Sequence, residues 1–276
     1  MKVKTEAAKE RTGTMTLKAI IFDVDGTLAE TEEAHREAFN AEFAARGLPW
    51  HWDRDVYKKL LSVTGGKERI RHYIETYAPE RGEEMLAHIP EIHKAKSERY
   101  MRMIADGSVP LRPGVARLIR EAKEAGLKVG IATTTSTPNV DALIQATLGR
   151  PAAEVFDAMA CGEEVTAKKP APDLYELALE KLGVAHNEAM AIEDSRNGLI
   201  AALRAGVPVV ATPSQYTADE DLSDALSVVS HLGEPDLPYE HISGFGWAQS
   251  MITPAMLARW IEGWSGRPRP PKAPIQ

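Results

Sequence analysis

Cysteine is almost missing from this chain, because Cys161 is the single cysteine among 276 residues. One cysteine cannot form a disulfide within the chain, and no C-x-x-C pair or Cys/His spacing typical of zinc sites is present. These absences exclude a disulfide-stapled secreted domain and a structural zinc module. A reducing compartment fits this composition, and we expect a cytoplasmic protein.

Long apolar runs and an excess of positive charge are also missing. No hydrophobic stretch approaches the roughly 20 residues that cross a membrane, and residues 1–16 are too polar for a signal peptide, so we interpret them as an N-terminal extension. The 33 basic residues are outnumbered by 40 acidic residues, which gives a formal net charge of −7. The chain therefore has neither a membrane span nor the basic stripe of a nucleic-acid-binding protein, and we expect neither partner.

What is present is an alternation of short apolar runs with helical patterns. Residues 17–22 (LKAIIF) predict a buried strand, and further strands are expected at 128–134, 156–161, 189–193 and 207–211. Helical periodicity that ends at glycine separates the later strands. Because strands joined by helices form right-handed crossovers, this order predicts an α/β fold with a parallel sheet.

The segments between and after these strands suggest the domain organisation. Residues 31–107 have helical patterns throughout and follow the first strand directly, so we expect a helical domain inserted into a core made of residues 17–30 and 108–232. Residues 233–276 form a tail that holds three of the five tryptophans and a proline-rich end. An amphipathic helix is expected after Thr253, packed on its own domain rather than against a second copy of the chain.

Two carboxylates follow the first strand in the segment DVDGT. Asp23 and Asp25 would repel each other unless a cation or a proton lies between them. Open α/β sheets bind ligands at the carboxyl ends of their strands, and carboxylate pairs there favour a hard cation such as Mg²⁺. The alternative, an acidic turn that caps a helix, explains Asp25 but not Asp23 next to the apolar run.

Hydroxyl and lysine side chains follow the next strands at the same expected edge. Thr133, Thr134 and Thr135 would form a neutral cradle for an anion such as phosphate, although threonines also cap many helices. Pro170 keeps Lys169 out of the following helix and fixes its charge near the sheet. Taken alone, this lysine is equally consistent with a solvated pair of surface lysines.

A second acidic pair, Glu193 and Asp194, follows the strand at 189–193. An N-cap role would explain Asp194 and leave Glu193 without a reason. All four clusters fall at the carboxyl ends of strands in one predicted sheet, and this coincidence indicates a single active site.

The ordered segments DVDGT, IATTT, KKPAPD and EDS resemble the motifs of the haloacid dehalogenase (HAD) superfamily of phosphatases and phosphomutases, over residues 17–232. This resemblance implies a Rossmann-like core with an inserted all-helical cap of the C1 type. It also implies that Asp23 is the nucleophile, forming an aspartyl-phosphate, and that Asp25 is the general acid and base. The residues implied to hold Mg²⁺ are Asp23, the backbone carbonyl of Asp25, and Asp194 with Glu193 in support. The residues implied to contact the phosphoryl group are Thr133, Thr134, Thr135 and Lys169.

Within that superfamily, the chain is similar to the xylulose-1,5-bisphosphate phosphatases of Calvin-cycle operons. The segments DVDGTLAETEEAHREAFN, TGGKERI and IATTTSTPNV carry this resemblance. It implies that the sugar and the far phosphate are contacted from the cap, by Glu32, His35, Gly65, Gly66, Lys67, Glu68 and Arg69. Lys67 and Arg69 on a glycine-opened turn would provide charge and backbone donors for a second anion.

The resemblance predicts the reaction and the partners. We expect Mg²⁺-dependent hydrolysis of the 1-phosphate of xylulose 1,5-bisphosphate, giving xylulose 5-phosphate. The alternatives are a broad sugar-phosphate phosphatase, a β-phosphoglucomutase-like mutase, and a scaffold without catalysis. We expect a monomer whose partner is a small sugar bisphosphate, with a dimer through residues 233–276 as the alternative.

Overall fold

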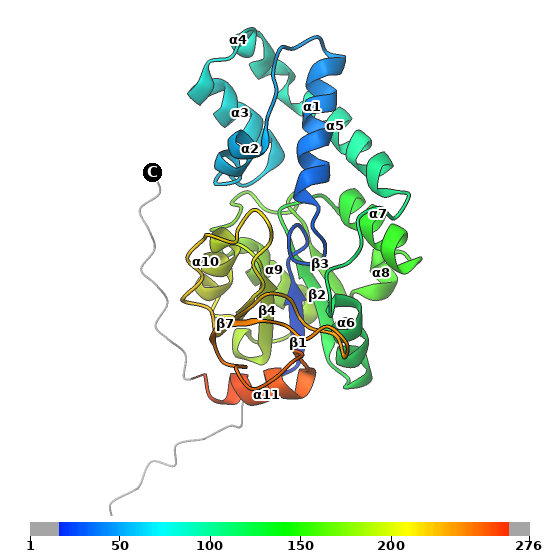
Figure 1. Cartoon of the computed structure of the whole chain (residues 1–276), viewed down its shortest axis with the longest axis vertical. Coiled ribbons are helices and arrows are strands. Elements are labelled where there is room, and N and C mark those ends of the chain that lie inside the picture. The colour runs from blue at the N-terminus through cyan, green and yellow to red at the C-terminus, as the bar shows by residue number, and fades with distance from the viewer. Residues whose placement is uncertain (1–16, 265–276) are drawn as a thin grey trace, which may run out of the picture.

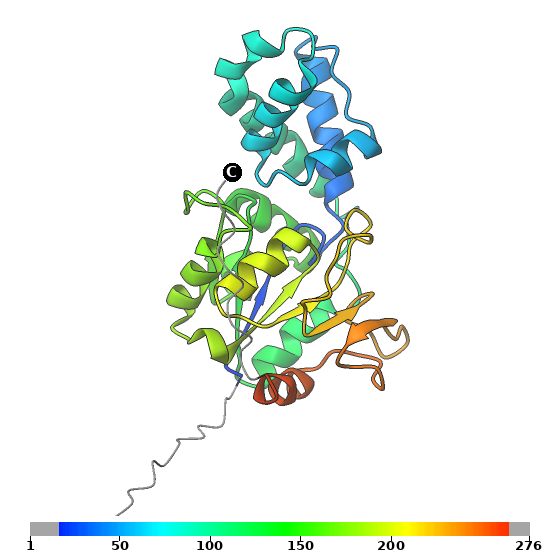
Figure 2. The same cartoon turned by 90° about the vertical axis from the view of Figure 1, so that its left-hand side faces the viewer.

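The computed structural model describes residues 17–264 and divides them into an α/β core and a helical cap. In two views the cap lies over one end of the core (Figure 1, Figure 2). Within the described range, no helix is both long and apolar enough to cross a membrane.

The core is built on one seven-stranded sheet with the strand order β3-β2-β1-β4-β5-β6-β7. The strands are β1 (Ala19–Phe22), β2 (Lys128–Ala132), β3 (Ala158–Ala160), β4 (Ala189–Glu193), β5 (Val209–Ala211), β6 (Ser227–Val229) and β7 (His241–Gly244). The first six are parallel, and β7 pairs antiparallel with β6 at the edge. From β1, the chain adds β2 and β3 on one side and then β4 and β5 on the other side. Parallel sheets bind ligands at such a switch point, in the crevice at the carboxyl ends of the strands.

Helices cover both faces of this sheet. They are α6 (Val115–Glu124), α7 (Thr137–Leu148), α8 (Ala152–Val155), α9 (Asp173–Leu182), η2 (His186–Glu188), α10 (Arg196–Arg204) and α11 (Pro254–Glu262). The alternation along β1 shows the two layers, since Ile20 and Phe22 pack in one hydrophobic cluster and Ala19 and Ile21 pack in the other. Burial on both faces explains why the run of residues 17–22 is apolar without interruption.

The cap is inserted between β1 and α6 and contains only helices. These are α1 (Glu32–Ala45), α2 (Arg54–Leu60), α3 (Gly66–Tyr77), α4 (Gly82–Met85), η1 (Leu86–His88) and α5 (Ile89–Ile104). The cap has its own hydrophobic cluster, in which aromatic rings such as Phe39, Phe43 and Trp52 pack together. The predicted α/β fold with an inserted helical cap is confirmed.

The described part of the tail packs on the core. Residues 233–264 contribute β7 to the sheet edge and α11 to one of its layers, where Met256, Leu257 and Ile261 are buried. The buried guanidinium of Arg117 on α6 holds this region, because it donates hydrogen bonds to the carbonyl oxygens of Leu232, Gly233 and Ile252. The expected N-terminal extension and the proline-rich end lie outside the described residues.

Replacement of Arg117 should therefore destabilise the chain. We expect Arg117→Ala to lower the free energy of unfolding by about 3 kcal/mol, because the carbonyl oxygens of Gly233 and Ile252 lose their donor, whereas that of Leu232 keeps the backbone N–H of Ile252. Urea denaturation followed by circular dichroism measures the loss. Arg120→Ala provides the control on the same helix, since its side chain is 65% exposed and pairs with Glu124 at 3.8 Å, and it should cost less than about 0.5 kcal/mol. Equal losses in the two variants would contradict the anchoring role of Arg117.

Candidate active site

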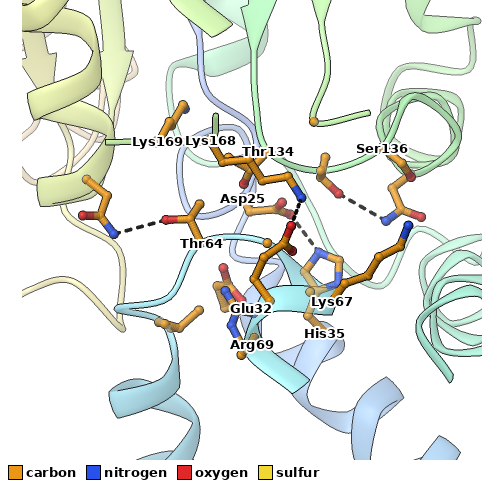
Figure 3. A pocket seen from close by; sticks show the side chains of 18 of the residues that line it. Asp25, Glu32, His35, Thr64, Lys67, Arg69, Thr134, Ser136, Lys168 and Lys169 are labelled. Carbon is orange, nitrogen blue, oxygen red and sulfur yellow. Dashed lines mark hydrogen bonds and ion pairs between the residues drawn. The ribbon is translucent and has the colours of Figure 1, made fainter. Parts of the chain in front are cut away.

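A cavity of about 630 Å³ lies between the carboxyl end of the sheet and the cap. Loops that follow β1, β2 and β4 line it from the core, and α1, α3 and α5 line it from the cap. Figure 3 shows Lys168, Lys169 and Thr134 from the core opposite Glu32, His35 and Arg69 from the cap. The cavity therefore has a core wall, formed by loops that follow the strands, and a cap wall, formed by helices of the cap.

On the core wall, a buried lysine bridges two of the predicted acids. The ammonium of Lys169 donates to Asp23 Oδ1 and to Glu193 Oε1, both at 2.6 Å. Tyr175 also donates to Glu193 Oε1 at 2.6 Å. Glu193 therefore lies beneath Lys169 and does not line the cavity. This arrangement fixes the lysine charge next to the carboxylate of Asp23.

The acids of the core wall form a group that fits a divalent cation. Ligand oxygens of Asp23, Glu193 and Asp194 lie within 4.8 Å of one another, and all three side chains are buried. Burial raises the pKa of Asp23 to about 8 despite the opposing effect of Lys169, and burial with repulsion from Asp23 raises the pKa of Asp194 well above its usual value. One ammonium does not balance three buried carboxylates, so this cluster favours binding of a cation.

Asp25 faces away from that cluster and toward the cap. Its Oδ1 accepts hydrogen bonds from Thr31 at 2.6 Å and from His35 Nε2 at 3.0 Å. Burial alone would raise the pKa of Asp25, but the charge and hydrogen bonds of these neighbours outweigh it and lower the pKa to about 2. Asp25 is thus held as a carboxylate, the form that accepts a proton from water.

Lys96 on α5 is a site residue that the sequence analysis missed. It is buried, its ammonium lies 2.5 Å from His35 Nδ1, and it faces the rings of Phe39 and Tyr100. Burial lowers the pKa of Lys96 to about 7, and burial together with Lys96 lowers the pKa of His35. Lys96 and His35 therefore form a buried path of exchangeable protons that ends at Asp25.

On the cap wall, Tyr57 joins two of the predicted sugar-binding residues. Its hydroxyl donates to Glu32 Oε2 at 2.7 Å and accepts from Arg69 Nη1 at 3.0 Å. Arg69 is buried, it forms no ion pair with another described residue, and its Nε lacks a hydrogen-bond partner there. A buried guanidinium without a carboxylate partner is costly unless an anion binds to it.

The glycine turn lies at the start of α3, beside Arg69. Gly65 has φ +97°, a left-handed conformation that favours glycine, and Gly66 leaves room for the ring of His93. Lys67 lines the cavity, whereas Glu68 forms an ion pair of 2.8 Å with Lys168 across the two walls. The first turn of α3 therefore adds a lysine and the N-terminal end of a helix to the cap wall.

The three predicted threonines occupy different places after β2. Thr134 and Thr135 line the cavity, whereas Thr133 is buried below it and its hydroxyl accepts a hydrogen bond from the Thr135 backbone at 3.2 Å. Of all the predicted site residues, only Thr133 and Glu193 are absent from the cavity lining. Both lie directly beneath residues that do line it.

Comparisons with known proteins agree with this geometry. A family model described as haloacid dehalogenase-like hydrolase matches residues 17–206. Protein CbbY of Rhodobacter capsulatus is 51% identical over 230 residues, which is 81% of this chain and 100% of that protein. The plasmid-borne Protein CbbY of Cupriavidus necator is 48% identical over 252 residues, covering 90% of this chain and 98% of that protein.

Solved structures give the same result. The crystal structure of CbbY from Rhodobacter sphaeroides in complex with phosphate superimposes with a TM-score of 0.72 at 47% identity, over 78% of this chain and 94% of that one. A mutant of the same protein in complex with xylulose-(1,5)bisphosphate gives a TM-score of 0.72 at 48% identity, with the same coverage. The fold is thus shared over most of both chains.

Proposed function

Because this chain belongs to the haloacid dehalogenase-like hydrolases and is a phosphoric monoester hydrolase, we propose that it removes the 1-phosphate of xylulose 1,5-bisphosphate. The product is xylulose 5-phosphate, and the reaction passes through a phosphorylated Asp23. Support comes from the CbbY relatives and from the related structure that contains the sugar bisphosphate.

Arg69 is the observation that carries this proposal. It is a buried cation without an acidic partner among the described residues, and it faces a cavity whose opposite wall holds Asp23, Asp194 and Lys169. A substrate with one phosphate at the core wall and a second anionic group at the cap wall would satisfy both ends. A simple phosphate monoester would leave Arg69 without its counterion.

The mechanism begins with attack of an Asp23 oxygen on phosphorus. The bond between phosphorus and the oxygen of C1 breaks, and that oxygen takes a proton from Asp25, which must first have been protonated through His35. Water then attacks the phosphoryl group on Asp23 and gives its proton to Asp25, which releases phosphate and restores the carboxylate of Asp23. Lys169 and the groups after β2 offset the negative charge on the phosphoryl oxygens.

The proposed mechanism includes a divalent cation. We propose Mg²⁺ as the cofactor, held by Asp23, the Asp25 backbone carbonyl and Asp194, with Glu193 in support through Lys169. When bound, Mg²⁺ supplies positive charge that neutralises and aligns the reacting groups.

Phosphate release from xylulose 1,5-bisphosphate, with Mg²⁺ or with EDTA, tests the proposal directly. We expect Mg²⁺-dependent release and a kcat/KM at least about 100-fold above that of xylulose 5-phosphate, because the bisphosphate adds a charged contact to Arg69. Similar rates on unrelated sugar monophosphates would instead indicate a broad phosphatase. Conversion of glucose 1-phosphate to its 6-phosphate without net release would indicate a mutase.

A further inference from the structure

One core residue enters the aromatic cluster of the cap. Tyr216, in the loop of residues 212–220 after β5, is 9% exposed and belongs to the same hydrophobic cluster as Phe39, Trp52 and Tyr57. Among the described residues, every other member of that cluster lies in the cap. The loop therefore reaches from the sheet into the other domain.

The contacts of Tyr216 with the cap are specific. Its ring lies edge-on to Tyr57, with centroids 5.6 Å apart and planes at 82°, and its hydroxyl donates to Glu33 Oε2 at 2.5 Å. Glu33 is fixed in turn by hydrogen bonds from Arg36. The Tyr57 hydroxyl bonds to both Glu32 and Arg69, so a rotation of the Tyr57 ring would move the group that joins the two residues proposed to contact the substrate.

The next residue of the same loop contacts the acidic cluster. Thr217 donates to Asp194 Oδ2 at 3.2 Å, and its hydroxyl also accepts from the Ser214 backbone at 2.8 Å. Tyr216 thus lies between a residue that orients Asp194 and a residue that orients the cap wall. One short loop links both walls of the cavity.

From these contacts we propose that Tyr216 is a positioning residue that couples sugar-bisphosphate binding by the cap to the acidic cluster of the core. Tyr216 itself lines the cavity, and its proposed effect passes through Tyr57. The inference rests on the proposed function and goes beyond it, because it assigns discrimination between substrates to a core residue rather than to the cap alone. Small esters that do not reach Glu32 and Arg69 gain little from this coupling.

The test compares Tyr216→Ala with wild-type enzyme on two substrates, xylulose 1,5-bisphosphate and p-nitrophenyl phosphate. We expect the ratio of their kcat/KM values to fall about tenfold, mainly through a higher KM for the bisphosphate, because an aromatic contact that orients the cap wall is lost. Tyr216→Phe keeps the ring and should restore most of the ratio. A merely structural role would lower the activity on both substrates alike and leave the ratio unchanged, which would overturn the proposal.

Two further variants complete the design. Asp219→Ala removes a surface ion pair of 2.7 Å between the same loop and Lys58 of the cap, and it should leave the ratio within about twofold of wild type. Tyr57→Phe removes the hydroxyl between Glu32 and Arg69, so adding Tyr216→Ala to it should have less effect than in wild type. Multiplicative effects in that cycle would refute action through Tyr57. If wild type itself does not prefer the bisphosphate, the proposed function fails rather than this coupling.

Discussion

Asp23→Asn should reduce kcat by about 10⁴-fold or more while leaving the chain folded, because an amide cannot act as the nucleophile. The side chains have nearly the same shape, and the amide oxygen can still accept the hydrogen bond from Lys169. Phosphate release under saturating bisphosphate measures the loss. Mass spectrometry of quenched wild-type enzyme should show one added phosphoryl group, and the variant should show none.

The control for this substitution is an acid outside the cavity. Asp236→Asn changes an exposed loop carboxylate in the same way, and kcat should stay within about twofold of wild type. Thermal melting by circular dichroism verifies that both variants are folded. Substantial turnover by folded Asp23→Asn, or a phosphoryl group still attached to that variant, would disprove covalent catalysis through Asp23.

Lys169→Met should affect both stability and turnover. The substitution removes the ammonium that lies 2.6 Å from Asp23 and from Glu193, and leaves those buried carboxylates without their cation. We expect a loss of about 3–5 kcal/mol in the free energy of unfolding, measured in EDTA so that no divalent cation replaces the lysine. We also expect kcat to fall by about 10²- to 10³-fold, because charge on the phosphoryl oxygens is no longer offset.

Two companion variants separate these effects. Lys168→Met alters the neighbouring lysine, whose ion pair with Glu68 is more exposed, and should cost less than about 1 kcal/mol. Adding Glu193→Gln to Lys169→Met removes one unpaired carboxylate, so stability should partly return while turnover does not. Recovery of turnover together with stability would show that Lys169 has only a structural role.

The parts of the site that follow strands could be predicted from sequence. Asp23 comes directly after an apolar run, Glu193 and Asp194 come directly after another, and parallel strands end at one edge of a sheet, so local pattern and topology were sufficient to expect them together. The glycine turn before Arg69 was predicted only through the resemblance of TGGKERI to a known family, because its place opposite the strand ends depends on how the cap packs on the core.

The parts that depend on contact between distant segments could not be predicted in this way. Lys96 lies on an amphipathic helix among other charged residues, and it becomes a site residue only because α5 packs beside α1, where His35 is. Tyr57 and Tyr216 are aromatic residues, and from sequence alone each would be interpreted as an ordinary core residue. Their roles depend on the contact between the cap and the loop that follows β5. β6 and β7 were both missed, because SVV is only three residues long and HISG is short, largely exposed and not alternating in hydrophobicity.

The placement of the tryptophans gives the chain two built-in optical reporters. Trp50 and Trp52 are buried among aromatic rings of the cap, whereas Trp247 is 80% exposed beside the edge strand β7. Iodide in the solvent will quench emission from Trp247 and leave the cap pair shielded. When the partly buried Trp260 and Trp264 of the core are replaced by Phe, the remaining blue-shifted emission reports on the ring packing of the cap, so its response to a bound sugar phosphate can be followed without any added label.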